Sequence, residues 1–305
     1  MKSRDPFLDD LLALSPSELT PIWLEAARSQ AARRKPADLM AQFQRDRFVA
    51  PSFLDQREAI ALDGHALAAA SGFEAILLSP VAPLGVCSSV APTSQDRTIS
   101  AVRALEVVSD PTNVLALECA RRLKKDPATT VRLATVHQVV RAQPAPPGKA
   151  FSQHFRLFAM VEAGPAQPED GFEVESLVRH MGVFNDLFNR LERTGLSFPG
   201  RRAEVLVTPE RRTLKDRLVE RLRRELPDVS VDSADLDQVY YDGVRVRFGA
   251  RATSGDFVPI GDLGVFDWMN KLTANRKRRF VASGFGLQLA PALFGGPAAR
   301  SSAQP

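Results

Sequence analysis

The stretch "VRLATVHQVVRAQPAPPGKAFSQHFRLFAMVEAG", Val131–Gly164, holds two apolar runs on either side of a turn rich in proline. Successive residues of a strand point to opposite faces of a sheet, and the first run alternates in this way. Proline lacks the N–H group that a strand ladder needs, so the prolines end regular pairing. The stretch therefore predicts an antiparallel hairpin of residues 131–141 and about 154–163, with Arg141 and Gln143 beside its turn.

The composition is that of a folded globular protein: of 305 residues, 44% are apolar and 25% are charged. The formal net charge of +4 permits a nucleotide or nucleic-acid partner but does not require one. The two cysteines, Cys87 and Cys119, lack the spacing of a metal site, so we expect reduced, buried thiols in a cytoplasmic protein. We expect no membrane association, because no stretch approaches the roughly 20 apolar residues of a membrane span.

The segments before the hairpin predict helices and two short strands, Phe73–Leu78 and Ala104–Val108. Residues 1–50 indicate an N-terminal helical extension that begins with a capping box. Asp55 can cap a second helix, and Phe73–Leu78 then predicts a buried strand. Pro111 is typical of the first position of a helix, which Ser109 or Asp110 would cap.

The segments after the hairpin alternate between amphipathic helices and short strands. We expect helices over residues 171–195 and 208–227, around Trp268 and after Gly284, and strands over residues 203–207, 239–251 and 280–282. This order predicts an α+β fold in which helices flank a mostly antiparallel sheet. We divide the chain into the extension at 1–50, a core at 51–295 and a disordered tail at 296–305.

Self-contained catalytic motifs such as a phosphate-binding lysine loop, a nucleophile elbow or a zinc-binding His-Glu-x-x-His are missing from the sequence. Several degenerate motifs instead occur in a fixed order: "SGFEAILLSP", "VSDPT", "VVRAQ", "VYYDG", "GVFD" and "SGFGLQL". In this order they resemble the catalytic core of class II aminoacyl-tRNA synthetases, and within it the histidyl branch. The resemblance covers about residues 55–294 and implies the class II synthetase-like fold.

The hairpin resembles the second motif of that family. Arg141 takes the place of the arginine that grips the α-phosphate of ATP, and Gln143 replaces the glutamate that meets the adenine amino group. Phe155 matches the phenylalanine that stacks on adenine, with Phe151 as the alternative. A guanidinium suits phosphate oxygens, and an aromatic ring offers a base a flat apolar face. The resemblance implies a nucleotide site here, with ATP and Mg²⁺ as its cofactors and Arg141 as the catalytic residue.

The other motifs resemble the family's amino-acid pocket. Asp110 and Thr112 of "VSDPT" fall on the glutamate and threonine of the histidyl "RPEGT" segment. Tyr240 and Tyr241 of "VYYDG" match a tyrosine pair in a pocket strand, and Gly284 opens the third motif. The resemblance implies an amino-acid ligand held by these five residues.

Three cations that the family uses are replaced. Val108 takes the place of the arginine in "RPEGT". Leu236 takes the place of a second family arginine, which lies over the reacting carboxylate of the amino acid. The acidic residue and the arginine that end the third motif fall on Ala290 and Pro291. Losing one charge-stabilising group typically costs about 3 kcal/mol of transition-state stabilisation, so we do not expect efficient adenylate formation.

The chain is also similar in length and architecture to the regulatory subunit of ATP phosphoribosyltransferase. The resemblance implies a homodimeric paralogue that does not aminoacylate tRNA, binds an amino acid or nucleotide, and regulates a partner enzyme. ATP phosphoribosyltransferase, in histidine biosynthesis, is the candidate partner. The alternative is an ATP-dependent ligase that adenylates an amino or carboxylic acid for a carrier protein or small molecule. We do not expect RNA binding, because "RRLKK" and "NRKRR" lack interleaved aromatic residues and are typical of helix ends and turns.

Overall fold

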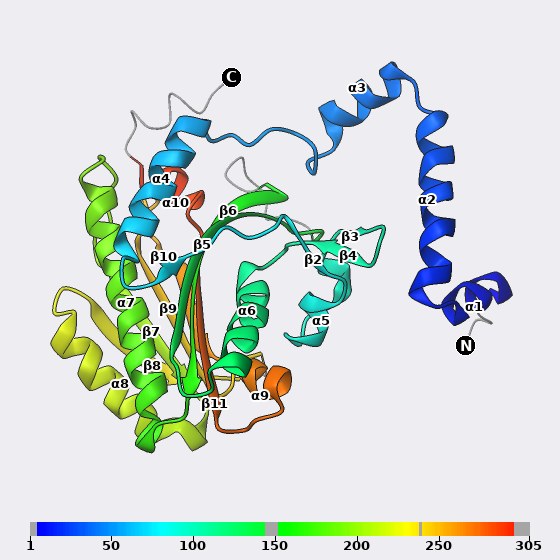
Figure 1. The fold of residues 1–305 in the computed structure, drawn as a ribbon. Helices are drawn as coiled ribbons and strands as arrows, with labels where there is room; N and C mark the ends of the chain where they lie inside the picture. The colour runs from blue at the N-terminus through cyan, green and yellow to red at the C-terminus, as the bar shows by residue number, and fades with distance from the viewer. Residues whose placement is uncertain (1–4, 144–151, 238–239, 296–305) are drawn as a thin grey trace.

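An eight-stranded sheet forms the centre of the computed structural model, which describes residues 5–143, 152–237 and 240–295 (Figure 1). In sheet order the strands are β1 (Glu74–Ala75), β5 (Val131–Val140), β6 (His154–Pro165), β11 (Arg278–Phe285), β10 (Phe257–Val265), β9 (Val244–Arg251), β7 (Arg202–Val207) and β8 (Ser230–Asp235). The inner pairs are antiparallel, whereas the edge strands β1 and β8 run parallel to their neighbours. The predicted α+β class with a mostly antiparallel sheet is confirmed.

The predicted hairpin is present as β5 and β6. Val131 lies opposite Ala163, and Val140 lies opposite His154. The side chains of β5 alternate between two hydrophobic cores, with Leu133 in one and Ala134 in the other. Because both faces are covered, most side chains of the hairpin are buried, and these include the polar residues Thr135, His137 and Glu162 as well as apolar ones.

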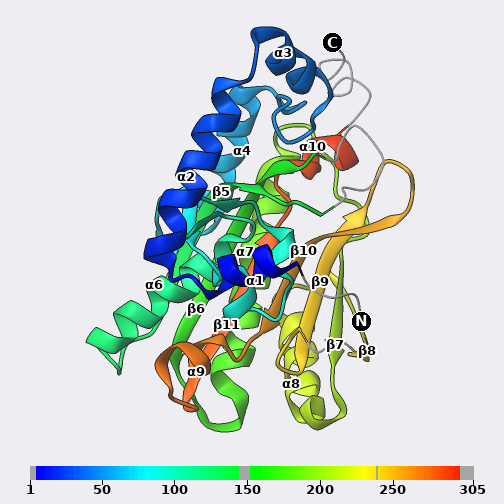
Figure 2. The ribbon, with the colours of Figure 1, turned by 90° about the vertical axis from the view of Figure 1, so that its right-hand side faces the viewer.

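Helices cover both faces of the sheet (Figures 1 and 2). On one face, Phe184, Phe188 and Phe248 stack in a core rich in phenylalanine. On the other face, a smaller core surrounds Leu115 and Trp268. The helices of the first core are α4 (Gln56–Ala69), α7 (Gly171–Glu192), α8 (Arg212–Glu225) and α10 (Leu289–Phe294), and those of the second are α5 (Val86–Ser89), α6 (Pro111–Lys125) and α9 (Trp268–Thr273).

A small second sheet stands beside the hairpin. Its strands lie in the order β2 (Val81–Pro83), β4 (Leu105–Val107) and β3 (Ser100–Ala101). The chain reaches β3 through a short 3₁₀ turn, η1 (Gln95–Arg97), and two further 3₁₀ turns, η2 (Pro168–Asp170) and η3 (Pro209–Arg211), precede α7 and α8.

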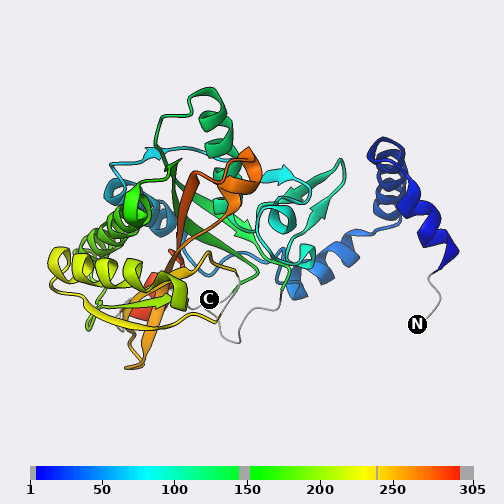
Figure 3. The ribbon, with the colours of Figure 1, turned by 90° about the horizontal axis from the view of Figure 1, so that it is seen from below.

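Three helices precede the core. They are α1 (Pro6–Ala13), α2 (Pro16–Ala32) and α3 (Pro36–Arg45), and they project away from it (Figure 3). We call residues 5–50 the arm. Among the described residues, no helix combines the length and apolarity that a membrane span requires.

Three sequence predictions differ from the structure. Phe73–Leu78 is not a buried strand: only Glu74 and Ala75 are in β1, and Leu77 is 94% exposed. The strand stays short because it lies at the sheet edge and the chain leaves β5 after the hydrogen bond from Ile76 N to Ala134 O.

The other two differences concern β9 and β8. Strand β9 begins only at Val244, because Gly243 turns the chain with a φ of 76°. Tyr240 and Tyr241 therefore lie in the turn and not in the strand. Strand β8 was not predicted, since its side chains are mostly polar and exposed, as suits an edge strand. The tail at 296–305 lies outside the described residues.

A buried carboxylate ties the hairpin to α7. Glu162 is 1% exposed, and Arg132 Nε donates to its Oε2 at 3.0 Å. Arg179 Nε and His180 Nε2 lie 3.2 and 3.5 Å from Oε1, and His180 Nδ1 is 2.8 Å from Ser283 Oγ. Burial alone would raise the pKa of Glu162, but the imidazole and the two guanidinium groups outweigh it and lower the pKa to about 2. The carboxylate is thus held ionised between three cationic or titratable partners.

We predict that this carboxylate makes stability pH-dependent. A lowered pKa contributes stability above the ordinary value of 4.5, and that contribution, roughly 3 kcal/mol, is lost as pH falls toward 2. Glu162→Gln should cost about 3 kcal/mol at pH 7 and flatten this pH dependence, because the amide no longer gains the ionised-state interactions with Arg132, Arg179 and His180 that lower the pKa of Glu162. Urea unfolding at pH 7 and pH 3 measures both effects. Glu25→Gln, at an exposed ion pair, is the control, and equal costs for the two variants would contradict the prediction.

Candidate active site at the hairpin end

A cavity of about 550 Å³ opens where the hairpin, the start of α6 and the ends of β10 and β11 meet. Elements distant in the sequence converge here because the sheet order places β11 beside β6 and β10 beside β11. All eight site residues predicted from the sequence line the cavity: Asp110, Thr112, Arg141, Gln143, Phe155, Tyr240, Tyr241 and Gly284. Binding of a nucleotide or an amino acid by these residues is a prediction that the cavity lining does not test. The alternative Phe151 lies outside the described residues.

Arg141 lies directly after β5 rather than within it, and three contacts hold it. Its backbone N–H donates to Gln153 O at 2.8 Å, and its Nε donates to Ser109 O at 3.1 Å. The guanidinium stands over the ring of Phe155, 5.1 Å from the ring centre. The side chain is therefore fixed before any ligand enters.

The Arg141 cation is only partly balanced. Burial lowers its pKa, and the carboxylate of Asp110, 3.8 Å from the guanidinium, opposes that shift. An ion pair at this distance is not a bidentate one, and the Arg141 side chain, which is 24% exposed, lines the cavity. The group can therefore accept a carboxylate or phosphate in a partly desolvated setting, where such an interaction is stronger than in water.

Asp110, one of the two caps that the sequence offered, is the N-cap of α6, and the alternative Ser109 is not. Its Oδ1 accepts hydrogen bonds from Thr112 N at 3.0 Å and Thr112 Oγ1 at 2.7 Å. The other oxygen, Oδ2, faces Arg141. The cap thus places one carboxylate oxygen in the cavity beside the start of the helix.

Tyr240 and Tyr241 form the aromatic wall. Their rings meet edge to face with centres 4.9 Å apart, and Phe266 contacts both. Burial, aided by Asp110 for Tyr240 and Asp262 for Tyr241, raises the pKa of both phenols. Both groups are therefore neutral hydroxyls at physiological pH, and each can donate a hydrogen bond.

Arg97 and Asp262 line the same cavity but were not among the predicted residues. Arg97 ends η1, and its carbonyl accepts a hydrogen bond from Ala142 N at 2.8 Å, which ties it to the hairpin end. No local motif marks Arg97, since its position depends on the fold of the small sheet. Asp262 did carry a signal: it is a lone acidic residue in the apolar run of β10, where Arg245 pairs with it at 2.6 Å.

Glu106 on β4 holds the segment that carries Arg97. It is 1% exposed and accepts hydrogen bonds from Gly85 N at 2.8 Å, Cys87 N at 3.0 Å and Gln95 Nε2 at 2.7 Å. Because Gln95 lies two residues before Arg97, this carboxylate positions the second cavity cation without touching the cavity.

The end of the cavity formed by the predicted third motif, "SGFGLQL", is largely apolar, and we call it the third-motif end. Gly284, Gly286 and Leu289 line it there, while Ala290 and Pro291 are buried within α10. Leu236 is buried and does not line the cavity. Among the described lining residues, the cations are Arg97 and Arg141, and both approach from the hairpin side.

Within the described residues, the cavity has no preformed cage of protein ligands for a metal ion. It offers two carboxylates, Asp110 and Asp262, which contact Thr112 and Arg245 respectively. Mg²⁺ bound with a nucleotide needs only one or two carboxylates beside the phosphates, and Oδ2 of Asp110 is available for that role. Arg141 and Phe155 have the chemistry that an α-phosphate and a base require, whereas Gly286 and Leu289 on the other side of the cavity carry no charge.

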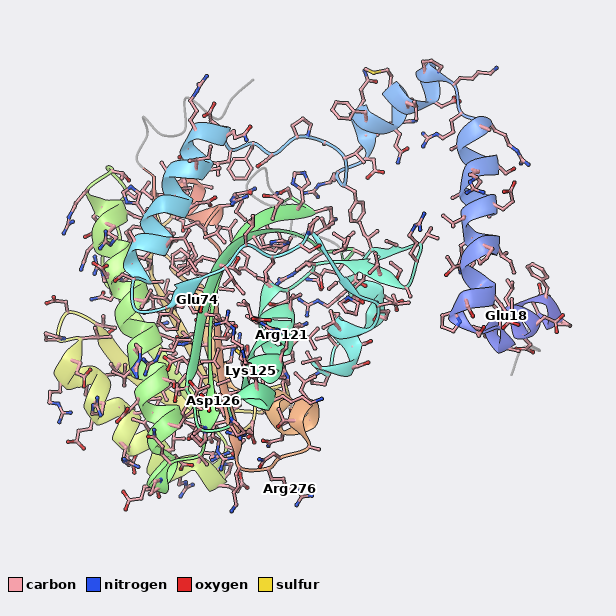
Figure 4. The ribbon with its side chains drawn as sticks, in the orientation of Figure 1. Glu18, Glu74, Arg121, Lys125, Asp126 and Arg276 are labelled. Atoms are coloured by element: carbon pink, nitrogen blue, oxygen red, sulfur yellow. The ribbon has the colours of Figure 1, made fainter. Side chains whose placement is uncertain are left out.

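Two of the four basic residues of "RRLKK" are in ion pairs. Arg121 and Arg122 both pair with Glu118, and Arg122 also pairs with Glu74 at the sheet edge. Figure 4 shows Glu74 near Arg121 and Lys125, far from Glu18 on the arm. The interpretation of this segment as a helix end is confirmed, because it forms the last turn of α6.

We predict that Glu106→Gln frees the segment around Arg97. The amide keeps one acceptor oxygen, but its NH2 group would face either Cys87 N or the pair Gly85 N and Gln95 Nε2, and each unsatisfied buried group costs about 1–3 kcal/mol. Hydrogen exchange should speed up at the amides of Gly85 and Cys87 while the hairpin amides stay protected. Glu58→Gln on α4 is the matched control. Unchanged exchange at both amides would contradict the positioning role of Glu106.

Comparison with known proteins shows the fold and not a family. No protein-family model matches this sequence, and no curated protein does either. Among solved structures, an ATP phosphoribosyltransferase regulatory subunit/histidyl-tRNA synthetase from Bacillus halodurans matches with a TM-score of 0.57 at 14% identity, over 80% of this chain and 81% of that one. Apo histidyl-tRNA synthetase from S. aureus matches with a TM-score of 0.59 at 10% identity, over 80% and 69% of the two chains.

A histidine–tRNA ligase subunit from Alicyclobacillus acidocaldarius matches with a TM-score of 0.56 at 12% identity, over 79% of this chain and 96% of that one. The class II synthetase-like fold and the likeness to histidyl-branch structures, both predicted from the motifs, are thereby confirmed.

Proposed function

We propose that this chain is a non-aminoacylating, histidyl-tRNA synthetase-like protein whose cavity binds an amino acid and which regulates a partner enzyme. The observation that carries the proposal is the placement of charge in the cavity. Arg97 and Arg141 offer cations on the hairpin side, Asp110 and Asp262 offer carboxylates, and the third-motif end is apolar. This arrangement suits a zwitterion better than a triphosphate.

The chemistry of an amino acid matches these groups one by one. Its carboxylate pairs with the Arg141 guanidinium, which is already held over Phe155. Its ammonium pairs with Oδ2 of Asp110 or with Asp262. Its side chain packs against the tyrosine wall, where the hydroxyl groups of Tyr240 and Tyr241 can select a polar group.

The same cavity supports only part of the machinery for adenylate formation. Arg141 and Phe155 could hold an AMP moiety, so ATP is a second ligand within the proposal. Transition-state stabilisation for pyrophosphate release needs cations at the outgoing phosphates, where this cavity has Gly286 and Leu289. Binding without turnover is the expected behaviour.

The proposed partner is the catalytic subunit of ATP phosphoribosyltransferase, with the protein acting as a homodimer. This step is supported by the likeness to the Bacillus halodurans regulatory subunit/histidyl-tRNA synthetase, which is matched over 81% of its length. A carrier-protein partner belongs to the ligase alternative.

We predict that one of the twenty amino acids raises the melting temperature. A ligand at 100 times its Kd stabilises the folded state by about 2.7 kcal/mol. Arg141→Ala should abolish this shift, and Arg97→Ala should weaken binding about tenfold, whereas Arg57→Ala, at a side chain that is 94% exposed, should leave it intact. A thermal-shift screen of the amino acids, with and without ATP, provides the measurement. Absence of stabilisation by any of them would count against the proposal.

Pyrophosphate exchange separates the proposal from the ligase alternative. We predict exchange at the background level with every amino acid that binds, because the cations among the described lining residues, Arg97 and Arg141, both lie on the hairpin side and leave the opposite side without one. Exchange that depends on ATP and an acid, and that Arg141→Ala removes, would instead establish the ligase.

A further inference from the structure

Two pairs of opposite charges and one further cation lie around the cavity. Arg245 on β9 donates to both carboxylate oxygens of Asp262, at 3.0 and 2.6 Å, so this pair is balanced. Arg141 and Asp110 form the second pair, with 3.8 Å between their charged groups. Arg97 also lines the cavity, and among the described residues no carboxylate forms an ion pair with it. Three arginines therefore face two aspartates, and the described lining has an excess of positive charge.

The Arg97 side chain is held at the cavity wall. It is half-buried, and its Nε–H is shielded from solvent without a hydrogen-bond partner among the described residues. The backbone of Arg97 is fixed as well, because its carbonyl accepts from Ala142 N at 2.8 Å and its N–H donates to Ser94 O at 3.2 Å. Buried donors in proteins are nearly always satisfied, so this one indicates a place for an acceptor that the protein itself does not supply.

Arg97 and Arg141 are close enough for their charges to interact. Burial is the main cause of the lowered pKa of Arg141, and the positive charge of Arg97 lowers that pKa further. Burial likewise raises the pKa of Tyr240, and the charges that act on this phenol are those of Asp110, Arg97, Arg141 and Asp262. All four charged groups of the described lining are therefore within electrostatic reach of one hydroxyl. A second anionic group on the ligand would relieve the repulsion between the two guanidinium groups.

We propose that the amino acid bound in the cavity has an acidic side chain, whose anionic group pairs with Arg97 while its α-carboxylate pairs with Arg141. This inference rests on the proposed function, which places an amino acid in the cavity, and adds the chemical class of its side chain. A zwitterion with a neutral side chain would balance its own charges and leave Arg97 unpaired. A ligand with a second anionic group has a net negative charge, which matches the excess of positive charge in the lining.

Matched pairs of amino acids test the inference on the unmodified protein. L-Aspartate and L-asparagine, like L-glutamate and L-glutamine, have side chains of nearly the same shape and differ in charge. In isothermal titration calorimetry, the acid of at least one pair should bind about tenfold more tightly than its amide, since a charge-assisted pair is stronger than a neutral hydrogen bond. O-phospho-L-serine, compared with L-serine and with the two dicarboxylic acids, shows whether the anionic group is a phosphate or a carboxylate.

Variants of Arg97 show whether this residue causes the preference. Arg97→Gln should weaken binding of the acid about tenfold and leave binding of the amide nearly unchanged, because only the acid loses a charged partner. Arg97→Lys keeps the charge and should keep the preference for the acid. Arg103→Gln, at an exposed arginine between β3 and β4, removes the same charge from the same small sheet and is the matched control. Unchanged thermal melts show that the variants fold.

Two results would overturn the inference and leave the proposed function intact. One is an amide that binds as tightly as its acid, because an amino acid would still occupy the cavity. The other is a preference for acids that survives Arg97→Gln, since another group would then hold the side chain. If none of the acidic ligands binds, the inference is wrong, and the proposed function fails with it only if the screen of all twenty amino acids finds no ligand either.

Discussion

The half-buried guanidinium of Arg141 makes the contacts on which the rest of the site depends. A cation at the end of a hairpin would normally reach into water, but here the carbonyl of Ser109, the ring of Phe155 and the carboxylate of Asp110 enclose it. Burial lowers its pKa, which means that the charged state is kept at some cost in solvation. An incoming anion would relieve that cost. The hairpin, the capped start of α6 and the small sheet can each be understood as parts that hold this one cation in place.

Much of this architecture was predictable because it rests on local rules. The alternation of β5, the prolines after it and the Asp-Pro start of α6 each specify an element through backbone chemistry. The ordered motifs then gave the fold, and the eight residues they carried all line one cavity. Binding of a ligand by these residues is a further step, which the fold itself does not establish.

The remainder depends on long-range packing that no local pattern encodes. Arg97 enters the cavity only because Glu106 binds Gln95 and two backbone amides across the small sheet. Phe73–Leu78 carries an apolar pattern typical of a buried strand, yet it runs along a sheet edge where Leu77 is left uncovered. An apolar run in a sequence does not indicate whether the side chains are buried, and Leu77 is 94% exposed.

The uneven distribution of charge gives the cavity its proposed character. The hairpin side carries the Arg141 cation beside the aromatic face of Phe155, and the side of Gly286 and Leu289 is apolar. The most direct test is the structure of the complex with the amino acid that most stabilises the protein. We expect the ligand carboxylate within hydrogen-bond distance of the Arg141 guanidinium and its ammonium beside Asp110 or Asp262. A ligand bound outside the cavity, or oriented with its carboxylate toward Leu289, would contradict this assignment.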